Sequence, residues 1–263
     1  MIKKYYFQDN TLSLVLGDSF KVLKKIEPKS IDVIFADPPY FISGGGVSCQ
    51  SGKQVSVNKA DWDKKITIKE RLAFNRKWIK LCRNVLKDNG TIWISGTLHN
   101  IYSIGVALEE EGFSIINNVT WQKRNPPPNL ACRCFTNSTE TILWARKQLS
   151  SSKKGKHLFN YQLMKDVNGG KQMKDVWEIL PAGKKEKKFG KHPTQKPLEL
   201  LKRILIASTN ENDLVLDPFS GSGTTGLVCY ILKRRYIGID NSKDYLDLSI
   251  KRYESLKEEQ NDE

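Results

Sequence analysis

Short apolar runs alternate along this chain with segments whose apolar residues recur every three or four positions. Short runs bounded by turn residues are typical of buried strands, whereas the longer spacing is typical of amphipathic helices. The runs predict seven strands, at about residues 12–17, 31–36, 90–95, 113–121, 139–145, 213–217 and 235–239. Helices are predicted from Ser19 to Pro28, from Arg71 to Leu86 before an Asn89–Gly90 stop, from Pro197 to Ser208 and from Thr224 to Leu232. This alternation predicts an α/β fold, doubly wound around a mostly parallel seven-stranded sheet.

Two segments do not follow this alternation. Residues 43–61 contain three consecutive glycines and predict a mobile loop beside the strand that ends at Ala36. Residues 146–191 lack clear periodicity and predict an inserted region, although a disordered basic linker is the alternative. The expected division is therefore 1–145, an insertion at 146–191, and 192–263. The acidic end of the chain, from Lys257 onwards, is expected to fray.

The charge of the chain favours a polyanionic partner. Lys and Arg number 43 against 29 Asp and Glu, which leaves a net charge of +14. Residues 146–191 hold 13 basic and 4 acidic residues, so most of the excess lies in the insertion. Such a distribution is typical of nucleic-acid-binding proteins.

Other residue types narrow the setting. Five cysteines without a Cys-x-x-Cys pair predict a reduced, cytoplasmic protein without structural zinc, and the three histidines are too dispersed to predict a metal site. There is no signal peptide, and the apolar runs are shorter than the roughly 18 residues of a membrane span, so no membrane partner is expected.

The tetrapeptide Asp37-Pro38-Pro39-Tyr40 follows directly after the predicted strand 31–36. Ligands of open α/β sheets bind beyond the carboxyl ends of the strands. The exocyclic amine of a nucleobase is a poor nucleophile, and two acceptors can hold its hydrogens and turn its lone pair outward. Asp37 and the main-chain carbonyl of Pro38 can be these acceptors, and Tyr40 offers a ring on which a base can stack. By itself the motif is also consistent with an ordinary strand-ending turn.

A second element lies near the other end of the chain. The predicted strand 213–217 ends in Asp217 and runs through a glycine-rich turn, Ser220-Gly221-Ser222-Gly223, into a helix. Such turns bring backbone N–H groups close to a cofactor. Asp240 ends the next strand, at the distance where these folds place a carboxylate on ribose hydroxyls.

Together these segments resemble the DNA amino-methyltransferases that use S-adenosylmethionine. The resemblance runs from Leu14 to about Tyr253 and rests on four motifs, which are Asp37-Pro38-Pro39-Tyr40, His192-Pro193-Thr194-Gln195-Lys196-Pro197, the turn from Asp217 to Thr225, and Gly238-Ile239-Asp240. The catalytic motif comes first and the cofactor motif last, which is the permuted order of the β class. Segments 58–63, 74–79 and 94–100 resemble the second adenine methyltransferases of GATC-specific restriction systems.

This resemblance implies a site-specific DNA adenine-N6 methyltransferase with S-adenosylmethionine as its cofactor. It implies a target-recognition role for the insertion and catalytic roles for Asp37, Pro38, Pro39 and Tyr40. It implies cofactor contacts for Asp18, Thr194, Lys196, Asp217, Phe219, Ser220, Gly221, Ser222, Gly223, Thr224 and Asp240.

Several alternatives remain open from the sequence alone. Asp18 either contacts the cofactor's adenine or caps a helix, and Asp217 holds either the cofactor amine, the turn or a helix end. The 192–197 motif either places Lys196 on the cofactor's carboxylate or is only a helix entry. The loop from Arg124 to Asn129 either enters DNA or is a stiff surface loop. The rival functions are N4-cytosine methylation, RNA methylation and nucleic-acid binding without catalysis. The sequence does not decide whether the DNA substrate is single- or double-stranded, or whether the protein is a monomer or a homodimer.

Overall fold

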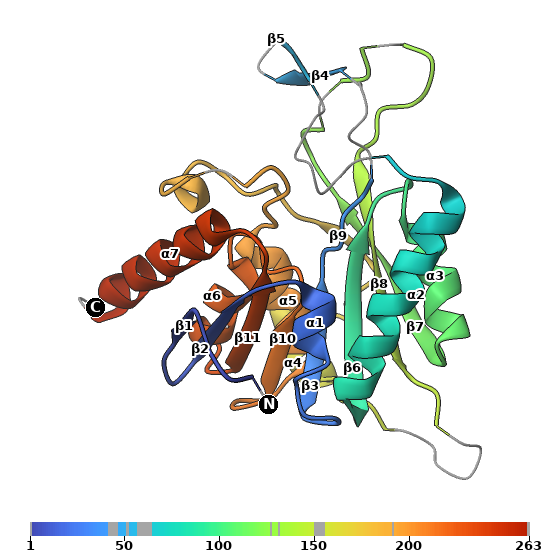
Figure 1. Ribbon diagram of the computed structural model, residues 1–263. Helices are drawn as coiled ribbons and strands as arrows, with labels where there is room; N and C mark the ends of the chain where they lie inside the picture. Colours follow the sequence, from blue (N-terminus) through green and yellow to red (C-terminus); the bar gives the residue numbers. More distant parts are fainter. Residues whose placement is uncertain are drawn as a thin grey trace.

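The computed structural model describes residues 2–41, 47–50, 53–56, 65–126, 128–130, 132–149, 156–190 and 192–261 (Figure 1). The larger part of the predicted loop 43–61, and segment 58–63 of the GATC resemblance, lie outside these residues. Within that loop the backbone forms a hairpin of β4 (Val47–Gln50) and β5 (Lys53–Ser56). Among the described residues, no helix is both long and apolar enough to cross a membrane.

The described residues form one large sheet with the strand order β1-β2-β11-β10-β3-β6-β8-β7-β9. Neighbours from β2 to β6 pair in parallel, β8 runs antiparallel to both β6 and β7, and β1 is antiparallel to β2. The strands are β1 (Phe7–Gln8), β2 (Leu12–Leu16), β3 (Ile31–Ala36), β6 (Leu86–Gly96), β7 (Phe113–Gln122), β8 (Thr139–Lys147), β9 (Val176–Glu178), β10 (Leu214–Asp217) and β11 (Arg235–Asp240).

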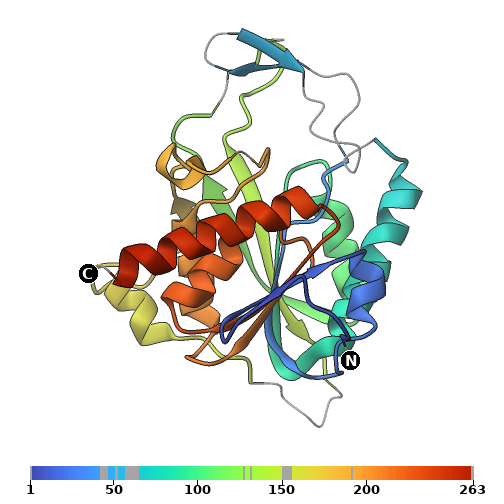
Figure 2. The same cartoon turned by 60° about the vertical axis from the view of Figure 1, so that its left-hand side comes forward.

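Helices cover both faces of the sheet (Figures 1 and 2). One face carries α1 (Ser19–Leu23), α2 (Ile68–Val85) and α3 (Ile101–Glu110). The other carries α4 (Tyr161–Val167), α5 (Leu198–Ser208), α6 (Thr224–Ile231) and α7 (Lys243–Asn261). The period of two along β3 explains this double layer, because Val33 and Phe35 belong to the core on the side of α4 to α7, while Ile34 and Ala36 belong to the core on the side of α1 to α3.

A cross-strand tryptophan pair joins the parallel and antiparallel parts of the sheet. Trp93 of β6 lies directly opposite Trp144 of β8, with ring centroids 4.6 Å apart and planes within 8° of parallel. The indole N–H of Trp93 donates to the hydroxyl of Ser208 at 3.0 Å, which ties the pair to α5. A stacked pair of this kind contributes about 0.5–1.5 kcal/mol beyond its burial.

All seven predicted strands are present, and the four predicted helices are confirmed with shifted ends. The helix expected from Arg71 begins earlier, at Ile68, because Thr67 and Glu70 form a capping box. Its other end, expected at Leu86, is confirmed to within one residue, because the helix stops at Val85; the Asn89–Gly90 pair lies within β6. Strands β1 and β9 were not predicted, since two or three residues are too few to show a period.

Of the predicted insertion 146–191, residues 146 and 147 belong to β8, and residues 156–190 are folded against the sheet, so a disordered linker is wrong for these residues. Strand β9 pairs with β7, and Trp177 at its centre is buried in the same core as Met164 of α4. The fraying expected at the acidic end is also wrong up to Asn261, because α7 continues to that residue. Lys188 of the insertion forms an ion pair with Glu259 of α7 at 2.6 Å.

Candidate active site

Four parallel neighbours in the sheet each end beside an aspartate. Strands β2, β11, β10 and β3 lead to Asp18, Asp240, Asp217 and Asp37 in that order. Because the carboxyl ends of parallel strands meet at one edge, residues far apart in the chain converge there. A pocket opens at this edge, lined by Asp18, Ser19, Phe20, Asp37, Pro39, Phe41, Phe74, His192, Thr194, Pro218, Phe219, Gly221, Ile239, Asp240, Asn241 and Tyr245.

Asp18 and Asp240 occupy the pocket while holding backbone groups. Asp18 caps α1 by accepting from the Lys21 N–H at 2.9 Å, so the helix-cap alternative holds for Asp18. Asp240 accepts from the Gly221 and Ser242 N–H groups, both at 2.8 Å. Burial raises the pKa of Asp240, and these two bonds oppose the rise. A carboxylate oxygen has further lone pairs, so both side chains can accept from a ligand as well.

Asp217 holds the glycine-rich turn and does not line the pocket. Its carboxylate accepts from the Phe219 N–H at 3.0 Å and from the Thr225 hydroxyl at 2.6 Å. Burial raises its pKa to about 7, against the effect of these hydrogen bonds. Of the three roles left open by the sequence, which are the cofactor amine, the turn and a helix end, this geometry favours fixing the turn.

The turn itself divides into exposed and buried parts. Phe219 and Gly221 line the pocket. Ser220, Ser222, Gly223 and Thr224, which the resemblance also implied as cofactor contacts, pack inward and do not line it. They join the turn to its neighbours: the Ser220 and Tyr236 hydroxyls lie 2.9 Å apart, and Arg252 of α7 donates to the Ser222 carbonyl and the Thr224 hydroxyl. Gly223 has φ +73°, and a Cβ there would lie 2.6 Å from the Ser249 hydroxyl, so only glycine allows this close approach.

One wall of the pocket is aromatic and was not predicted. Phe74 of α2 meets Phe20 and Phe41 edge to face, each with ring centroids 5.3 Å apart, and lies 6.5 Å from Phe219. Phe41, to which the sequence assigned no role, lines the pocket with φ +56°. Phe74 gave no signal in the sequence, because an aromatic residue on the apolar face of a helix reads as core packing.

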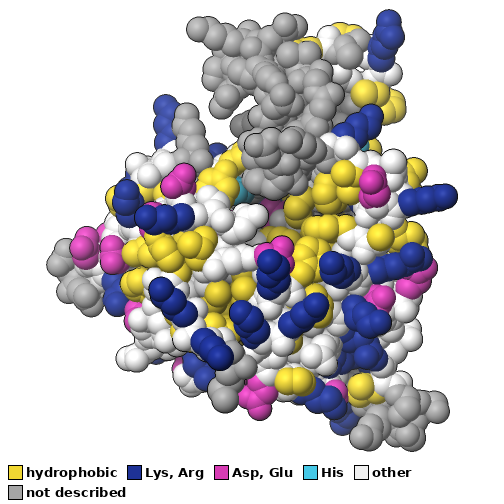
Figure 3. All heavy atoms as spheres, in the orientation of Figure 1, with side chains coloured by type: hydrophobic (Ala, Val, Ile, Leu, Met, Phe, Trp, Pro, Cys, Tyr) yellow, Lys and Arg dark blue, Asp and Glu magenta, His cyan; other side chains and the backbone are white. Residues whose placement is uncertain are grey.

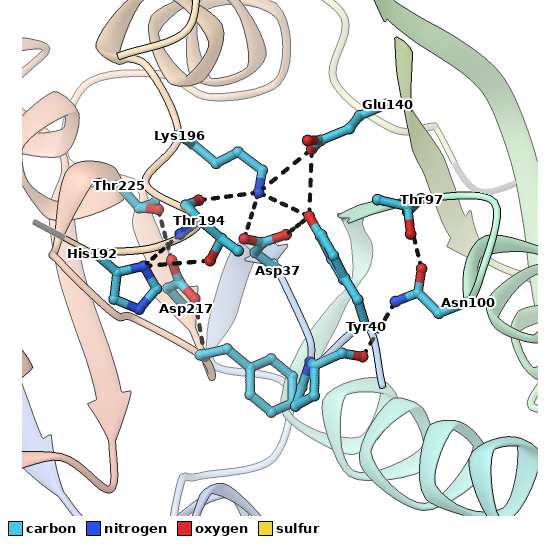
Figure 4. Close-up of polar contacts among 12 residues, drawn as sticks. Asp37, Tyr40, Thr97, Asn100, Glu140, His192, Thr194, Lys196, Asp217 and Thr225 are labelled. Carbon is cyan, nitrogen blue, oxygen red and sulfur yellow. Dashed lines mark hydrogen bonds and ion pairs between the residues drawn. The ribbon is translucent and has the colours of Figure 1, made fainter. Parts of the chain in front are cut away.

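The opposite side of Asp37 is a buried polar cluster (Figure 4). The Tyr40 hydroxyl donates to Asp37 Oδ1 at 2.6 Å, and the Lys196 ammonium donates to Asp37 Oδ2 at 2.5 Å and to the Tyr40 oxygen at 2.9 Å. Lys196 also lies 5.4 Å from the centre of the Tyr40 ring. The structure therefore brings Lys196 to the catalytic motif, whereas Thr194 from the same segment lines the pocket.

Two further residues of this cluster were not predicted from the sequence. Glu140, at the start of β8, approaches Lys196 at 3.6 Å and the Tyr40 hydroxyl at 3.4 Å. Its other oxygen accepts from Lys123 at 2.5 Å. Asn100 donates to the Pro39 carbonyl at 3.3 Å and so fixes the turn after Asp37. Neither residue belongs to a recognisable motif, so the sequence gives no indication that either one lies at the site.

The pocket combines two chemistries that suit S-adenosylmethionine. Its aromatic wall offers apolar surface for a planar base, and Asp240 and Asp18 offer acceptors for hydroxyl and amine groups. Asp37 belongs to the lining of the same pocket, so a cofactor held there would lie beside the catalytic motif.

A doubly wound sheet with a glycine-rich turn, a pocket of this chemistry and Asp37-Pro38-Pro39-Tyr40 at its rim defines an S-adenosylmethionine-dependent DNA methyltransferase. A family described as DNA methylase matches residues 31–251, and the chain belongs to that family.

The chain is similar over nearly its whole length to known type II methyltransferases. It is 61% identical to the type II methyltransferase M2.LlaDCHI of Lactococcus lactis subsp. cremoris, over 96% of this chain and 92% of the relative. It is 59% identical to M2.DpnII of Streptococcus pneumoniae, over 98% and 95% respectively. A solved structure, the M1.HpyAVI–SAM complex, superposes with a TM-score of 0.67 at 30% identity and covers 92% of this chain and 98% of its own. The chain is thus a site-specific DNA methyltransferase of restriction-modification type, with S-adenosylmethionine as cofactor and DNA as substrate.

Proposed function

We propose that this enzyme methylates the N6 amine of adenine within 5′-GATC-3′ and accepts single-stranded as well as duplex DNA. The observation that carries the proposal is the position of Asp37, which lines the cofactor pocket. Its carboxylate is held there by hydrogen bonds from the Tyr40 hydroxyl and the Lys196 ammonium. The similarity to M2.DpnII and M2.LlaDCHI over nearly the whole chain supports the placement among second methyltransferases.

The proposed chemistry needs no covalent intermediate. S-adenosylmethionine, when bound, supplies an electrophilic methyl group on a sulfonium centre. Asp37 and the Pro38 carbonyl accept hydrogen bonds from the two amine N–H groups and turn the lone pair of the amine outward. The new N–C bond replaces the methyl–sulfur bond of the cofactor, which leaves as a thioether, and the methylated amine releases one proton to solvent. Asn100 already holds the carbonyl of Pro39, which steadies the turn that presents the Pro38 carbonyl. Proximity and polarisation of the amine supply the catalysis.

Tyr40 has a second proposed role beside its hydrogen bond to Asp37. Its ring is the proposed stacking surface for the extruded base. In the present conformation Tyr40 is only 4% exposed, so a base reaches its ring after a rearrangement around it. On the cofactor side we assign Asp240 to the ribose hydroxyls, Asp18 to the adenine, and Thr194, Phe219 and Gly221 to the remaining contacts, since all five line the pocket.

DNA contact is proposed for the loop between β7 and β8 and for the insertion. The sequence from Lys123 to Ser138 contains no acidic residue, and it carries Arg124, Arg133 and a Phe135 side chain that is 97% exposed. Figure 3 shows Lys and Arg side chains spread widely over one face of the molecule, as expected for long-range attraction to phosphates. We further propose that the enzyme acts in the cytoplasm. We propose a monomer, with a homodimer as the alternative.

The experiment that tests the target is methyl incorporation into matched oligonucleotides. Single- and double-stranded versions carry GATC, GACC, or GATC whose adenine is already methylated at N6. We expect incorporation only into unmodified GATC, with single strands used at least as readily as duplex, because a single strand avoids the few kcal/mol of base extrusion. Equal incorporation into all three would reject the target, and activity confined to duplex would reject the claim on strandedness. Transfer to cytosine N4 would show as incorporation into premethylated GATC.

A further inference from the structure

Asp37 belongs to a buried network of alternating charges drawn from four separate segments of the chain, and Figure 4 shows its members Asp37, Lys196 and Glu140. Lys196 lies between the carboxylates of Asp37 and Glu140, at 2.5 Å and 3.6 Å, and Lys123 closes the network on the far side of Glu140 at 2.5 Å. The side chain of Lys196 is 5% exposed, that of Glu140 11% and that of Asp37 13%. Burying charges is costly unless each has partners, so each charged group of this network must stay close to its neighbour of opposite charge.

All three hydrogens of the Lys196 ammonium are used inside the protein. They are donated to Asp37 Oδ2, to the Tyr40 oxygen at 2.9 Å and to the Thr194 carbonyl at 3.4 Å. An ammonium group has three donors, so none remains for the carboxylate of a cofactor. Lys196 therefore acts on Asp37 and not on the pocket.

The electrostatic consequences for Asp37 have opposite signs. The pKa of Asp37 is raised overall, because burial raises it most; the charge of Lys196 opposes this rise, and the charge of Glu140 adds to it. For Lys196, burial lowers the pKa, but the two carboxylates outweigh burial and raise it, so the ammonium stays charged. A carboxyl group that carries a proton loses acceptor capacity toward an amine hydrogen.

We propose that Lys196 and Glu140 are positioning residues, with Lys196 keeping Asp37 ionised and aimed at the amine, and Glu140 setting how strongly it does so. This inference rests on the proposed role of Asp37 in methyl transfer. The two residues together fix the lower pH limit of the reaction, because the rate falls once Asp37 is protonated.

The test is the pH dependence of single-turnover methyl transfer to the preferred oligonucleotide. Lys196→Met removes the positive charge that stabilises ionised Asp37. The acidic limb of the pH–rate profile, where the rate falls as Asp37 is protonated, should therefore move to higher pH by about 1–3 units, and the rate near neutral pH should fall at least about tenfold. Lys196→Arg should keep the limb near its original position. Glu140→Gln removes a like charge beside Asp37, so the limb should move to lower pH. A purely structural role would not give shifts of opposite sign.

A control ion pair joins β6 to the start of β3, away from the pocket. Lys87 pairs with Asp32 at the opposite end of β3, at 2.6 Å, and is remote from the pocket. Lys87→Met removes an ion pair of similar length and should leave the pH profile unchanged. Thermal unfolding of each variant establishes that it is folded. If Lys196→Met does not fold, Glu140→Gln alone tests the inference: a shift of its acidic limb to lower pH supports the inference, and an unshifted limb contradicts it.

The possible outcomes separate this inference from the proposed function. Unchanged S-adenosylmethionine affinity together with a shifted limb in Lys196→Met supports the inference. Weakened cofactor affinity with an unshifted limb overturns it and returns Lys196 to the cofactor. Asp37→Ala is measured in parallel: if that variant keeps its activity the proposed catalytic role itself is wrong, whereas an inactive Asp37→Ala beside an unshifted Lys196→Met overturns the inference alone.

Discussion

Asp37 is the residue on which the proposed chemistry depends most directly. Asp37→Ala should retain S-adenosylmethionine binding and lose methyl transfer by on the order of 10²-fold or more, because its acceptor acts on the amine and not on the cofactor. Equilibrium binding and methyl incorporation are measured on one preparation. Asp37→Asn serves as the conservative partner, since it keeps the side-chain volume and leaves Lys196 a partner oxygen. Substantial turnover in both variants would contradict the assignment.

Asp240 should give the reverse pattern. Asp240→Ala removes a proposed acceptor for the ribose and should weaken cofactor affinity by about 1–3 kcal/mol, with a smaller effect on turnover at saturating cofactor. Because Asp240 also accepts from the Gly221 and Ser242 N–H groups, the stability of the variant is checked by thermal unfolding. An unchanged cofactor affinity in a folded variant would place the ribose elsewhere.

Single residues were predictable from the sequence where a strand end placed them at the edge of the sheet. Asp18, Asp37 and Asp240 line the pocket for that reason. Side chains whose position depends on tertiary packing were not predictable. Lys196 turns toward Asp37 although its motif suggests a cofactor contact, and Glu140 reaches the site only because β8 runs antiparallel to β6.

At the scale of elements, the 3₁₀ turn at Lys185–Lys187 carries the densest basic cluster of the described insertion. Replacing Lys184, Lys185, Lys187 and Lys188 by Gln should weaken DNA binding to all sequences. It should also flatten the salt dependence of binding, by up to about 0.9 for each phosphate that the variant no longer neutralises. The measurement is the slope of binding affinity against salt concentration, together with cofactor affinity, which should not change.

A control with the same change of net charge is available in the amino-terminal segment and after α1. Lys3, Lys4, Lys24 and Lys25 are exposed, and their replacement by Gln should leave the salt slope closer to that of the parent. If both quadruple variants flatten the slope equally, the turn contributes only general charge and not a defined surface for DNA.

Elements with a clear period were predictable, and elements defined by their neighbours were not. The strands β3, β7 and β8 are long enough for their apolar residues to mark a buried run. Strand β9 has three residues, of which only Trp177 is buried, and it becomes a strand because β7 offers an open edge. The amino-terminal end of α2 lies earlier than the spacing predicts for a local reason, which is the capping box at Thr67.

For the whole molecule, the buried carboxyl group of Asp217 makes stability depend on pH. Its folded pKa is about 7, above the unfolded value, so the folded state binds the extra proton and is stabilised at low pH. That contribution is complete below about pH 4, near the unfolded pKa of an aspartate, and is lost as the pH rises through about 7. The parent should therefore lose unfolding free energy as the pH rises between these two values. Asp217→Asn has no such carboxyl group, so its loss over the same range should be smaller by on the order of a few kcal/mol.

The measurement is chemical unfolding of parent and Asp217→Asn at several pH values. The asparagine keeps an acceptor for the Phe219 N–H, so the turn is expected to persist. A parallel pH dependence in the two proteins would show that other groups dominate this range.

The strand order has a consequence for how this protein is made. Strands β2 and β3 come from the first 36 residues, but β11 and β10 lie between them in the sheet. As the chain leaves the ribosome, the first half therefore emerges with a two-strand gap at its centre, which closes only when residues up to Asp240 have emerged. Pairing between such distant residues forms slowly and leaves strand edges exposed in the meantime. The pocket is thus assembled almost entirely after translation of the last strand, and nascent chains that stall before it present open edges to chaperones or to one another.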